Sequence, residues 1–422
     1  MPEIHQHRFE SGLVLLAQVY PDARSLSLTC RLPAGVASEP ADRSGLAPLL
    51  AEMIFRGAGD LDARAHSDEL DRLGVRRSAS ARRESTRFSA TMLAENVDEA
   101  LPRLLDMLCA PRLEEAALEP ARELGRQAIA GLADQPQQRV GHHLMRRCEP
   151  APFDRSVVGT LPGLEAIDLA DVQSFHRSNY VPDGSVLAVA GHLDFAALKD
   201  QVGQCLADWS GSATVPEAQS RAPQGYEHET ADTAQAHIGV AYDAPPAPDD
   251  QAALQRTAVA VLSGGMSGRL FTEVREKRGL CYSVYARYAG RRDRGHVLAQ
   301  AGTTVDRAQE TLDVLVGELR RLSDGVDEDE FERARTGLKS RLVMEGESTG
   351  ARASALAGDW HLYGRPRTLA ERAEEIEAVK LDQLRAYLAG HRPAAMTAVT
   401  IGPKPLDASA ALADTATEEA TS

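Results

Sequence analysis

Apolar residues recur along the first half of the chain with two periods, and together these periods predict both strands and helices. In residues 26–32, Leu26, Leu28, Cys30 and Leu32 alternate with polar residues, which is the period of a strand with one buried face. The same reasoning predicts strands over 13–18, 85–93 and 185–190. Apolar stripes at three- and four-residue steps predict helices over 45–55, 61–73, 96–109, 114–132, 137–148 and 169–180.

The second half repeats this pattern. Residues 237–242 read as a strand like 26–32, and 250–262 as a helix like 45–55. The run Ile167–Val172, which leads to Val186–Gly191, is echoed by Val379–Leu384 and Thr397–Gly402 about 210 residues later. The register is held over both runs, so the pattern predicts a duplicated α+β domain.

These patterns give a domain plan. We expect an N-terminal domain over 1–210, a linker rich in Ser, Pro and Gly over 211–226, and a C-terminal domain over 227–405. The tail, 406–422, is rich in Ala, Thr, Asp and Glu and is expected to be disordered.

One stretch of the second half, Ser263–Tyr288, combines several local signals. Gly264 and Gly265 form a breaker pair, after which apolar residues recur at helical steps. Gly279 ends this predicted helix as a C-terminal cap, and alternation then predicts a strand. Arg275, near the helix end, and Tyr282, early in the strand, should therefore meet across a tight corner.

Composition excludes several classes of function. The net charge of −15 and the absence of a Lys/Arg block argue against nucleic acid or an anionic membrane as a partner. No apolar run approaches a membrane span, and the first seven residues lack the pattern of a signal peptide. The five cysteines are scattered without metal-ligand spacing, as in a reduced, cytoplasmic protein.

The spacing of Arg275 and Tyr282 alone is also typical of a solvated helix residue and a half-buried strand residue. Their surroundings, Leu-Phe-x-x-Val-Arg-x-x-x-Gly-Leu-x-Tyr, are more specific. This motif resembles the C-terminal half of the pitrilysin/insulinase/mitochondrial processing peptidase family, M16. The resemblance spans nearly the whole chain. It implies two α/β-roll domains of the LuxS/metallopeptidase type, each an antiparallel sheet covered by helices, and substrate binding by Arg275, Tyr282, Gly264 and Gly265.

Active members of that family carry His-x-x-Glu-His on the first helix of the N-terminal domain, with two zinc ligands and a general base. In this chain the matching run, Gly45–Met53, places Pro48 and Glu52 at the two histidine positions and Ala51 at the base. A third ligand, a Glu roughly 75 residues further on in the family, falls at Ala128. The resemblance therefore implies no metal in this chain.

Other candidate chemistry is weaker. His142 and His143 are adjacent, so on a helix they point about 100° apart and cannot chelate one ion. His176 is expected to be a surface or capping residue. The glycine run at 264–268 lacks the Gly-Lys-Ser/Thr of a phosphate loop, and no nucleophile motif is present.

Within the short-chain branch of the family, one chain supplies zinc and base while the other supplies Arg and Tyr. The chain is similar to the second kind: a subunit inactive alone that works with a homologous zinc-bearing partner carrying His-x-x-Glu-His. Related pairs remove mitochondrial presequences, degrade bacterial peptides, or trim precursor peptides such as that of pyrroloquinoline quinone. The alternatives are a structural scaffold, like the inactive core subunits of respiratory complexes, and a homodimeric peptide-binding protein.

Overall fold

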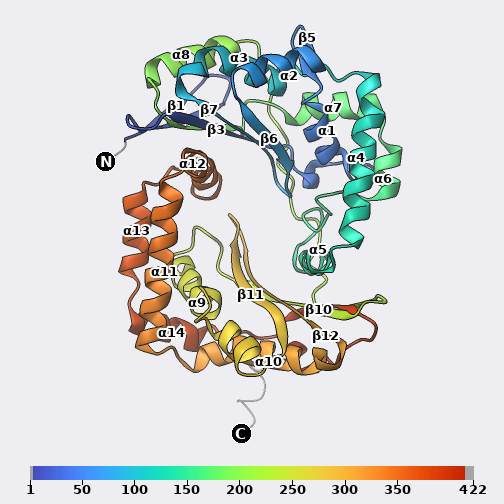
Figure 1. Ribbon diagram of the computed structural model, residues 1–422, viewed down its shortest axis with the longest axis vertical. Helices are drawn as coiled ribbons and strands as arrows, with labels where there is room; N and C mark the ends of the chain where they lie inside the picture. The colour runs from blue at the N-terminus through green and yellow to red at the C-terminus, as the bar shows by residue number, and fades with distance from the viewer. Residues whose placement is uncertain (1–2, 414–422) are drawn as a thin grey trace. The chain divides into compact units, whose positions relative to one another are not determined.

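The computed structural model describes residues 3–413, which form two compact units. Unit 1 comprises residues 3–131, 151–220 and 345–367. Unit 2 comprises residues 132–150, 221–344 and 368–413. Each unit is a single twisted sheet with helices on both faces (Figure 1).

The sheet of unit 1 has six strands in the order β1-β2-β8-β3-β7-β6. Its neighbours are antiparallel except for the parallel pair β2 and β8. The strands are β1 (Ile4–Arg8), β2 (Val14–Val19), β3 (Ser25–Leu32), β6 (Arg76–Ala81), β7 (Thr86–Leu93) and β8 (Val186–Gly191), beside a small hairpin of β4 (Gly57–Ala58) and β5 (Leu61–Asp62).

The sheet of unit 2 has five strands in the order β11-β12-β10-β13-β9, with one parallel pair, β13 and β9. The strands are β9 (Tyr226–Thr230), β10 (Gln235–Ala244), β11 (Cys281–Gly290), β12 (Gly295–Thr304) and β13 (Thr397–Gly402). Strand for strand, and in the direction of every pairing, this order repeats β6-β7-β3-β8-β2 of unit 1. The duplicated α+β fold expected from the sequence is therefore present, with β1 as an addition to unit 1.

One face of each sheet carries the main core. In unit 1 the alternating residues Leu26, Leu28 and Cys30 of β3 pack with Leu50 of α1 and Leu104 of α3. The helices of unit 1 are η1 (Val36–Ser38), α1 (Leu46–Met53), α2 (Ala63–Arg72), η2 (Ala94–Asn96), α3 (Val97–Cys109), α4 (Glu115–Ala133), α6 (Leu161–Ala166), α7 (Leu169–Asn179), α8 (Phe195–Cys205) and α12 (Thr349–Tyr363).

Unit 2 is built in the same way around Ile238 and Val240 of β10, which pack with Leu262 of α9 and Leu315 of α10. Its helices are α5 (Pro136–Cys148), α9 (Ala252–Ser263), the π-helical turn η3 (Phe271–Glu276), η4 (Val305–Arg307), α10 (Ala308–Arg321), η5 (Leu322–Asp324), α11 (Glu328–Gly346), α13 (Leu369–Ala378), α14 (Leu381–Gly390) and α15 (Ser409–Leu412).

The second face of each sheet is covered by a helix from the opposite half of the sequence. Helix α5 precedes the linker, yet Val140 and Leu144 pack on β10 and β13 of unit 2. Helix α12 lies in the second half, yet Leu356 and Ala357 pack against Val14 and neighbouring residues of unit 1. The two helices are thus exchanged between the sequence halves, so each fold is closed by the other half.

Several features were not expected from the sequence, including strands β1 and β6 and the π-helical form of the turn before Gly279. Residues 414–422 of the expected disordered tail lie outside the described residues, while α15 occupies 409–412. All five cysteines have free thiols. No helix within residues 3–413 combines the length and apolarity needed to cross a membrane.

Helix α12 is fixed to the sheet by a buried polar contact that offers a test of this packing. Arg352 is 1% exposed, and its Nε and Nη2 donate to Oε1 of Gln18 on β2 at 2.9 and 2.5 Å. We expect Gln18→Leu to lower the free energy of unfolding by about 1.5–3 kcal/mol, because the buried guanidinium then loses its acceptor. Urea unfolding followed by the fluorescence of the two tryptophans, Trp209 and Trp360, both in unit 1, measures this.

The double variant Gln18→Leu/Arg352→Leu is the matched control. It removes both polar partners and should recover most of the lost stability, because apolar groups can fill the same space. A single variant as stable as the parent chain would contradict this account of how α12 is held.

Candidate functional site

The corner around Arg275, formed by the turn Phe271–Glu276 and the start of β11, is fixed by buried residues that precede and follow Arg275. Leu270 and Val274 are fully buried in the core of unit 2. Arg269, 8% exposed, makes a two-point ion pair with Glu330 of α11 at 2.6 and 2.7 Å and donates to the carbonyl of Gly325. The turn that carries Arg275 is therefore fixed to the core of unit 2 and to α11.

The turn itself is π-helical over Phe271–Glu276, a form that inserts an extra residue into a helix and is frequent at functional sites. Gly279, with φ +59°, ends it in the left-handed conformation, as the sequence predicted. The amide of Leu280 then donates to the carbonyl of Val274 at 3.0 Å, and the chain enters β11. A short helix and an edge strand thus meet at a sharp corner.

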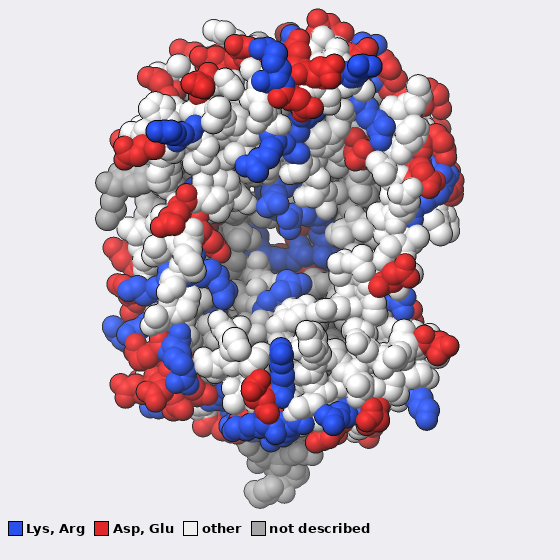
Figure 2. All heavy atoms as spheres, viewed as in Figure 1, with Lys and Arg blue, Asp and Glu red and all other residues white. Residues whose placement is uncertain are grey.

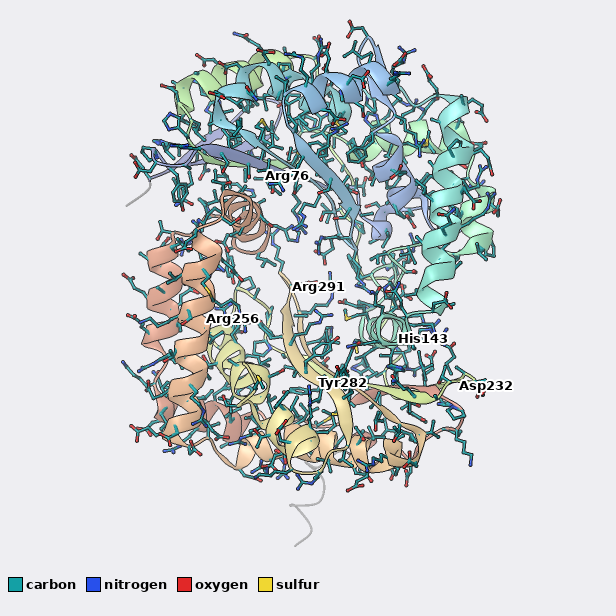
Figure 3. The ribbon with its side chains drawn as sticks, viewed as in Figure 1. Arg76, His143, Asp232, Arg256, Tyr282 and Arg291 are labelled. Atoms are coloured by element: carbon teal, nitrogen blue, oxygen red, sulfur yellow. The ribbon has the colours of Figure 1, made fainter. Side chains whose placement is uncertain are left out.

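Tyr282 lies at a β-bulge. Cys281 pairs with Thr303 of β12, but the next pair is Ser283 with Gly302, so Tyr282 is the unpaired extra residue. A bulge redirects the side chain that it carries. Tyr282 is accordingly 82% exposed, although it belongs to a strand, and Figure 3 labels it on β11.

Arg275 stacks between two aromatic rings. Its guanidinium carbon lies 4.7 Å from the ring centre of Phe271 and 5.3 Å from that of Tyr282, both cation–π contacts. The nearby carboxylate of Glu273 is occupied by Lys277 and Arg278, which lower its pKa to about 2. Arg275 makes no ion pair among the described residues, so its N–H donors are open to a ligand.

The two glycines expected to contact substrate lie just before the corner. Gly264 caps α9, and a Cβ there would meet the carbonyl oxygen of Ala260 at 2.4 Å, so the close turn requires glycine. Gly265 faces open space, and the neighbouring Met266 is 76% exposed. The loop is therefore accessible and adjoins the helical turn of Arg275.

The run matched to the zinc motif lies on α1 in unit 1. Pro48 stands in the first turn, where a missing N–H is tolerated. Ala51 is buried, and Glu52 forms an ion pair with Arg56 one turn on, with Oε1 and Nη2 3.0 Å apart. The packing keeps α1 as a helix while its side chains provide neither imidazole nor a free carboxylate pair.

Ala128, the position matched to the third ligand, is an exposed residue of α4. Within residues 3–413, no three His, Cys, Asp or Glu side chains gather closely enough to hold a metal ion. His143 contacts Glu227 and Glu229 of β9 at 3.1 and 3.3 Å. His176 is engaged with the carbonyl of Leu108, and burial lowers its pKa.

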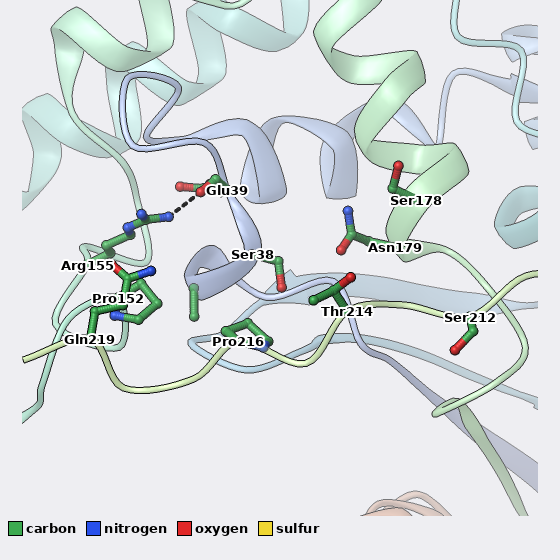
Figure 4. Close-up of a pocket in the computed structure, with 11 residues that line it drawn as sticks. Ser38, Glu39, Pro152, Arg155, Ser178, Asn179, Ser212, Thr214, Pro216 and Gln219 are labelled. Atoms are coloured by element: carbon green, nitrogen blue, oxygen red, sulfur yellow. Dashed lines mark hydrogen bonds between the residues drawn. The ribbon is translucent and has the colours of Figure 1, made fainter.

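A buried carboxyl holds the start of α1. Glu39 accepts hydrogen bonds from the amides of Gly45 and Ala47, at 3.2 and 2.8 Å. Burial raises the pKa of Glu39 to about 7, against the opposing effect of these amides and of Arg155. It borders a polar cavity of about 520 Å³ in unit 1, where Arg155 donates to the carbonyls of Val36 and Glu39 (Figure 4).

The residues that line this cavity include no cysteine or histidine, and the hydroxyl of Ser212 donates to Asp183 at 2.9 Å. The corner in unit 2, in contrast, presents a phenol and a guanidinium side by side on an accessible edge. Such a pair can donate hydrogen bonds to a carbonyl oxygen and to the charge that develops on it. The corner can therefore orient and polarise a substrate.

Comparison with known proteins places the fold. A family model described as insulinase (peptidase family M16) matches residues 15–160, and one described as the peptidase M16 inactive domain matches residues 166–338. The chain belongs to the M16 peptidase family.

Relatives include an uncharacterized zinc protease of Bacillus subtilis, 26% identical over 394 residues, which cover 90% of this chain and 94% of that protein. One from Streptomyces coelicolor is 28% identical over 402 residues, covering 90% and 86%.

Two solved structures share the fold. The peptidase M16 inactive domain from Pseudomonas fluorescens superimposes with a TM-score of 0.84 at 22% identity, covering 96% of this chain and 99% of that chain. A protease from Helicobacter pylori gives 0.82 at 18% identity, covering 95% and 100%. These matches confirm the two-domain α+β architecture.

The sequence analysis did not predict other clusters of polar residues that the structure brings together. Glu39 and Arg155 come together only through the tertiary fold, since 116 positions separate them. Arginines at the margin of the unit 1 sheet were also missed, because β6 itself was not predicted. The run Arg-Arg-Ser-Ala-Ser-Ala of β6 has small residues where a strand signal would show large apolar ones.

The altered α1 leads to a direct prediction about metal. We expect the purified chain, stripped with a chelator, loaded with excess Zn²⁺ and then dialysed against metal-free buffer, to retain no stoichiometric zinc, because catalytic sites need three protein ligands. Elemental analysis by mass spectrometry measures the content. One zinc per chain that resists dialysis would show that a ligand set exists elsewhere.

Glu39 leads to a prediction on pH. Its folded pKa, about 7, lies above the ordinary value of 4.5, so the folded state binds the proton more tightly than the unfolded state. Its contribution to stability is full below pH 4.5 and is lost as the pH rises through 7. We expect the melting temperature of the parent chain, relative to that of Glu39→Gln, to fall between pH 5 and 7.5. A difference that stays constant or grows with pH would contradict this.

Proposed function

We propose that this chain is the non-zinc subunit of a two-chain M16 peptidase, which binds and orients a peptide for cleavage by a homologous partner. The observation that carries the proposal is the exposed corner, where a bulge turns Tyr282 outward over an Arg275 that has no ion pair among the described residues. Exposing a tyrosine and a cation in this way brings no evident gain in stability. A ligand that uses both groups explains their geometry.

In this role Tyr282 donates a hydrogen bond to the scissile carbonyl as it becomes an oxyanion. A donor aimed at developing charge contributes to the rate directly, and removing one costs on the order of 10²–10³ in kcat in other enzymes. Arg275 donates to a neighbouring backbone carbonyl and holds the peptide in register. The guanidinium of Arg275 already lies over the aromatic ring of Phe271 in the free chain. Arg275 therefore loses less side-chain entropy when a peptide binds.

The strand that carries Tyr282 supplies a mode of binding. β11 is the last strand of its sheet, so one side of its backbone is not paired with another strand. An extended peptide can add to such an edge through main-chain hydrogen bonds, with little demand on its sequence. Peptide binding along β11 brings a carbonyl close to Tyr282, the unpaired residue of the bulge.

The hydrolytic chemistry is assigned to the partner. The positions matched to the family's zinc ligands and base are occupied by Pro48, Ala51, Glu52 and Ala128. Together these residues do not provide the three ligands of a zinc site. We therefore propose a homologous chain with His-x-x-Glu-His as the source of zinc and base. The competing role is a scaffold that only stabilises an assembly, and in that role nothing would depend on the phenol of Tyr282.

Activity of mixed chains tests the proposal. The chain and its zinc-motif partner are purified separately and assayed alone and together on a quenched fluorescent peptide library. We expect cleavage only in the mixture, and Tyr282→Phe should lower kcat by about 10²–10³ because one oxyanion donor is lost. Arg275→Gln should chiefly raise KM, because it removes a contact that positions the peptide.

Tyr285→Phe is the matched control, since Tyr285 is on the same strand but its hydroxyl donates to Gln300 at 2.6 Å. It should leave activity intact. Because Tyr282 is largely exposed, Tyr282→Phe should melt like the parent chain. A stable complex whose activity is unchanged by Tyr282→Phe establishes the scaffold role. Zinc-dependent cleavage by this chain alone overturns the proposal.

A further inference from the structure

The polar cavity of unit 1 has the dimensions of a ligand site. Its volume of about 520 Å³ falls in the range of cavities that hold small molecules. It is bounded by η1, by the end of α7, by the segment 152–155 and by the linker at 212–219 (Figure 4). Its lining is formed by hydroxyl, amide, arginine and glutamate side chains, with one alanine and two prolines and no aromatic residue. A ligand that fits this lining is small and hydrophilic.

Arg155 supplies the positive charge of the cavity. Its Nη1 donates to the carbonyls of Val36 and Glu39, which fixes the position of the guanidinium. Within residues 3–413 its Nε and Nη2 donate to no acceptor, and it forms no ion pair. On the outer surface of unit 1, at the top of Figure 2, basic side chains lie among acidic ones. Arg155, in contrast, has N–H donors available to an anionic group of a ligand.

The carboxyl of Glu39, which also borders the cavity, does not occupy these donors. Its two oxygens accept from the amides of Gly45 and Ala47, and the residue is 4% exposed. Burial raises the pKa of Glu39 to about 7, against the opposing effects of Arg155 and of the amides of Gly45, Leu46 and Ala47. Below this pH the carboxyl is largely protonated, so it neither neutralises Arg155 nor repels an anion.

Asn179 and Ser38 offer hydrogen-bonding groups without partners. Asn179, 8% exposed, donates from Nδ2 to the carbonyl of Phe175 at 3.0 Å, and its Oδ1 accepts from no donor in the described chain. The hydroxyl of Ser38 is buried and equally unpaired there. In Figure 4 Arg155 lies at one end of the cavity and Asn179 at the other, with Ser38 between them. Because buried polar groups are normally paired, hydroxyl groups on a ligand would complete this lining.

The linker forms a wall of the cavity that is fixed at its two ends. At one end Ser212 donates to Asp183 at 2.9 Å, and at the other the amide of Gln219 donates to the carbonyl of Ala151 at 2.8 Å. Between these points, residues 213–218 form no hydrogen bond with other residues of the described chain. The middle of this segment lines the cavity, so a bound ligand would contact and restrain it.

From this geometry we propose that the cavity binds a small hydroxylated anion, a carboxylate or phosphate ester about the size of a hexose, and that binding restrains the linker. Arg155 binds the charged group, while Asn179 and Ser38 bind hydroxyl groups. A neutral polyol leaves the donors of Arg155 without a charged partner, and a cation is repelled by it. The inference does not depend on the proposed function, since the site shares no residue with the corner of Arg275.

Isothermal titration calorimetry of the purified full chain with three matched probes tests the proposal. Gluconate carries a carboxylate, glucose 6-phosphate carries a phosphate ester, and glucose carries neither. The titrations are made near pH 6, below the pKa of Glu39. We expect one or both anions to bind at least about ten-fold more tightly than glucose, because Arg155 gains a charge-assisted hydrogen bond. The anion that binds more tightly identifies the charged group that the site takes.

Substitutions locate the site. Arg155→Gln should weaken binding of the tighter anion by about ten-fold or more, because the charge is lost while an amide still donates to the neighbouring carbonyls. Arg64→Gln, on α2 with a side chain 92% exposed, makes the same change in net charge and should keep the affinity within about two-fold. Thr214→Glu places a carboxylate on the exposed linker wall and should also weaken binding, which keeps the test valid if Arg155→Gln folds poorly.

Limited proteolysis gives a second readout on the linker. Glu217 is exposed in the middle of the segment 213–218, and a glutamate-specific protease can cut after it. The tighter anion should slow this cut several-fold in the parent chain but not in Arg155→Gln, as mass spectrometry of the fragments will show.

Three results would overturn the proposal. The first is that neither anion binds more tightly than glucose. The second is an equal loss of affinity in Arg64→Gln, which would mean that only net charge matters. The third is parent-like binding by both Arg155→Gln and Thr214→Glu, which would place the anion outside this cavity.

Discussion

The fold depends on a constraint that each sheet imposes: its central strands are buried on both faces, and the local sequence covers only one of these faces. The β-strands at the centre of each unit, such as β8 and β13, are buried at every residue. The second face of unit 1 is closed by α12 and that of unit 2 by α5, each supplied by the other half of the chain. The strands that stay open at the sheet margins are those that these two helices do not reach.

Because each exchanged helix covers the central strands, the strand furthest from it stays open in both units. In unit 1 this strand is β6, and in unit 2 it is β11, which carries Tyr282. The duplication therefore produces two equivalent edges with different chemistry. The edge of unit 1 begins with Arg76 and Arg77, and the edge of unit 2 has a bulge and a π-helical turn.

Much of this could be predicted from the sequence. The alternation of Leu26, Leu28 and Cys30 and the repeat at Thr397–Gly402 correctly indicated strands and a duplicated fold, because burial on a single face leaves a clear period. Gly279 correctly marked the end of a helix. The bulge at Tyr282 was not predictable, since it arises from the register with β12. The sheet on which α5 packs was not predictable either, because an apolar stripe shows that a helix packs against something without showing which sheet.

The exchange of α5 and α12 also bears on how the chain can be divided. The sequence suggests a two-part gene product joined by a linker, but neither part contains all the helices that its own sheet requires. A protease that cuts between the two sheets within the linker would break one peptide bond and leave each piece still holding a helix of the other. The two sequence halves are therefore not self-sufficient modules, because each needs a helix of the other to complete its fold.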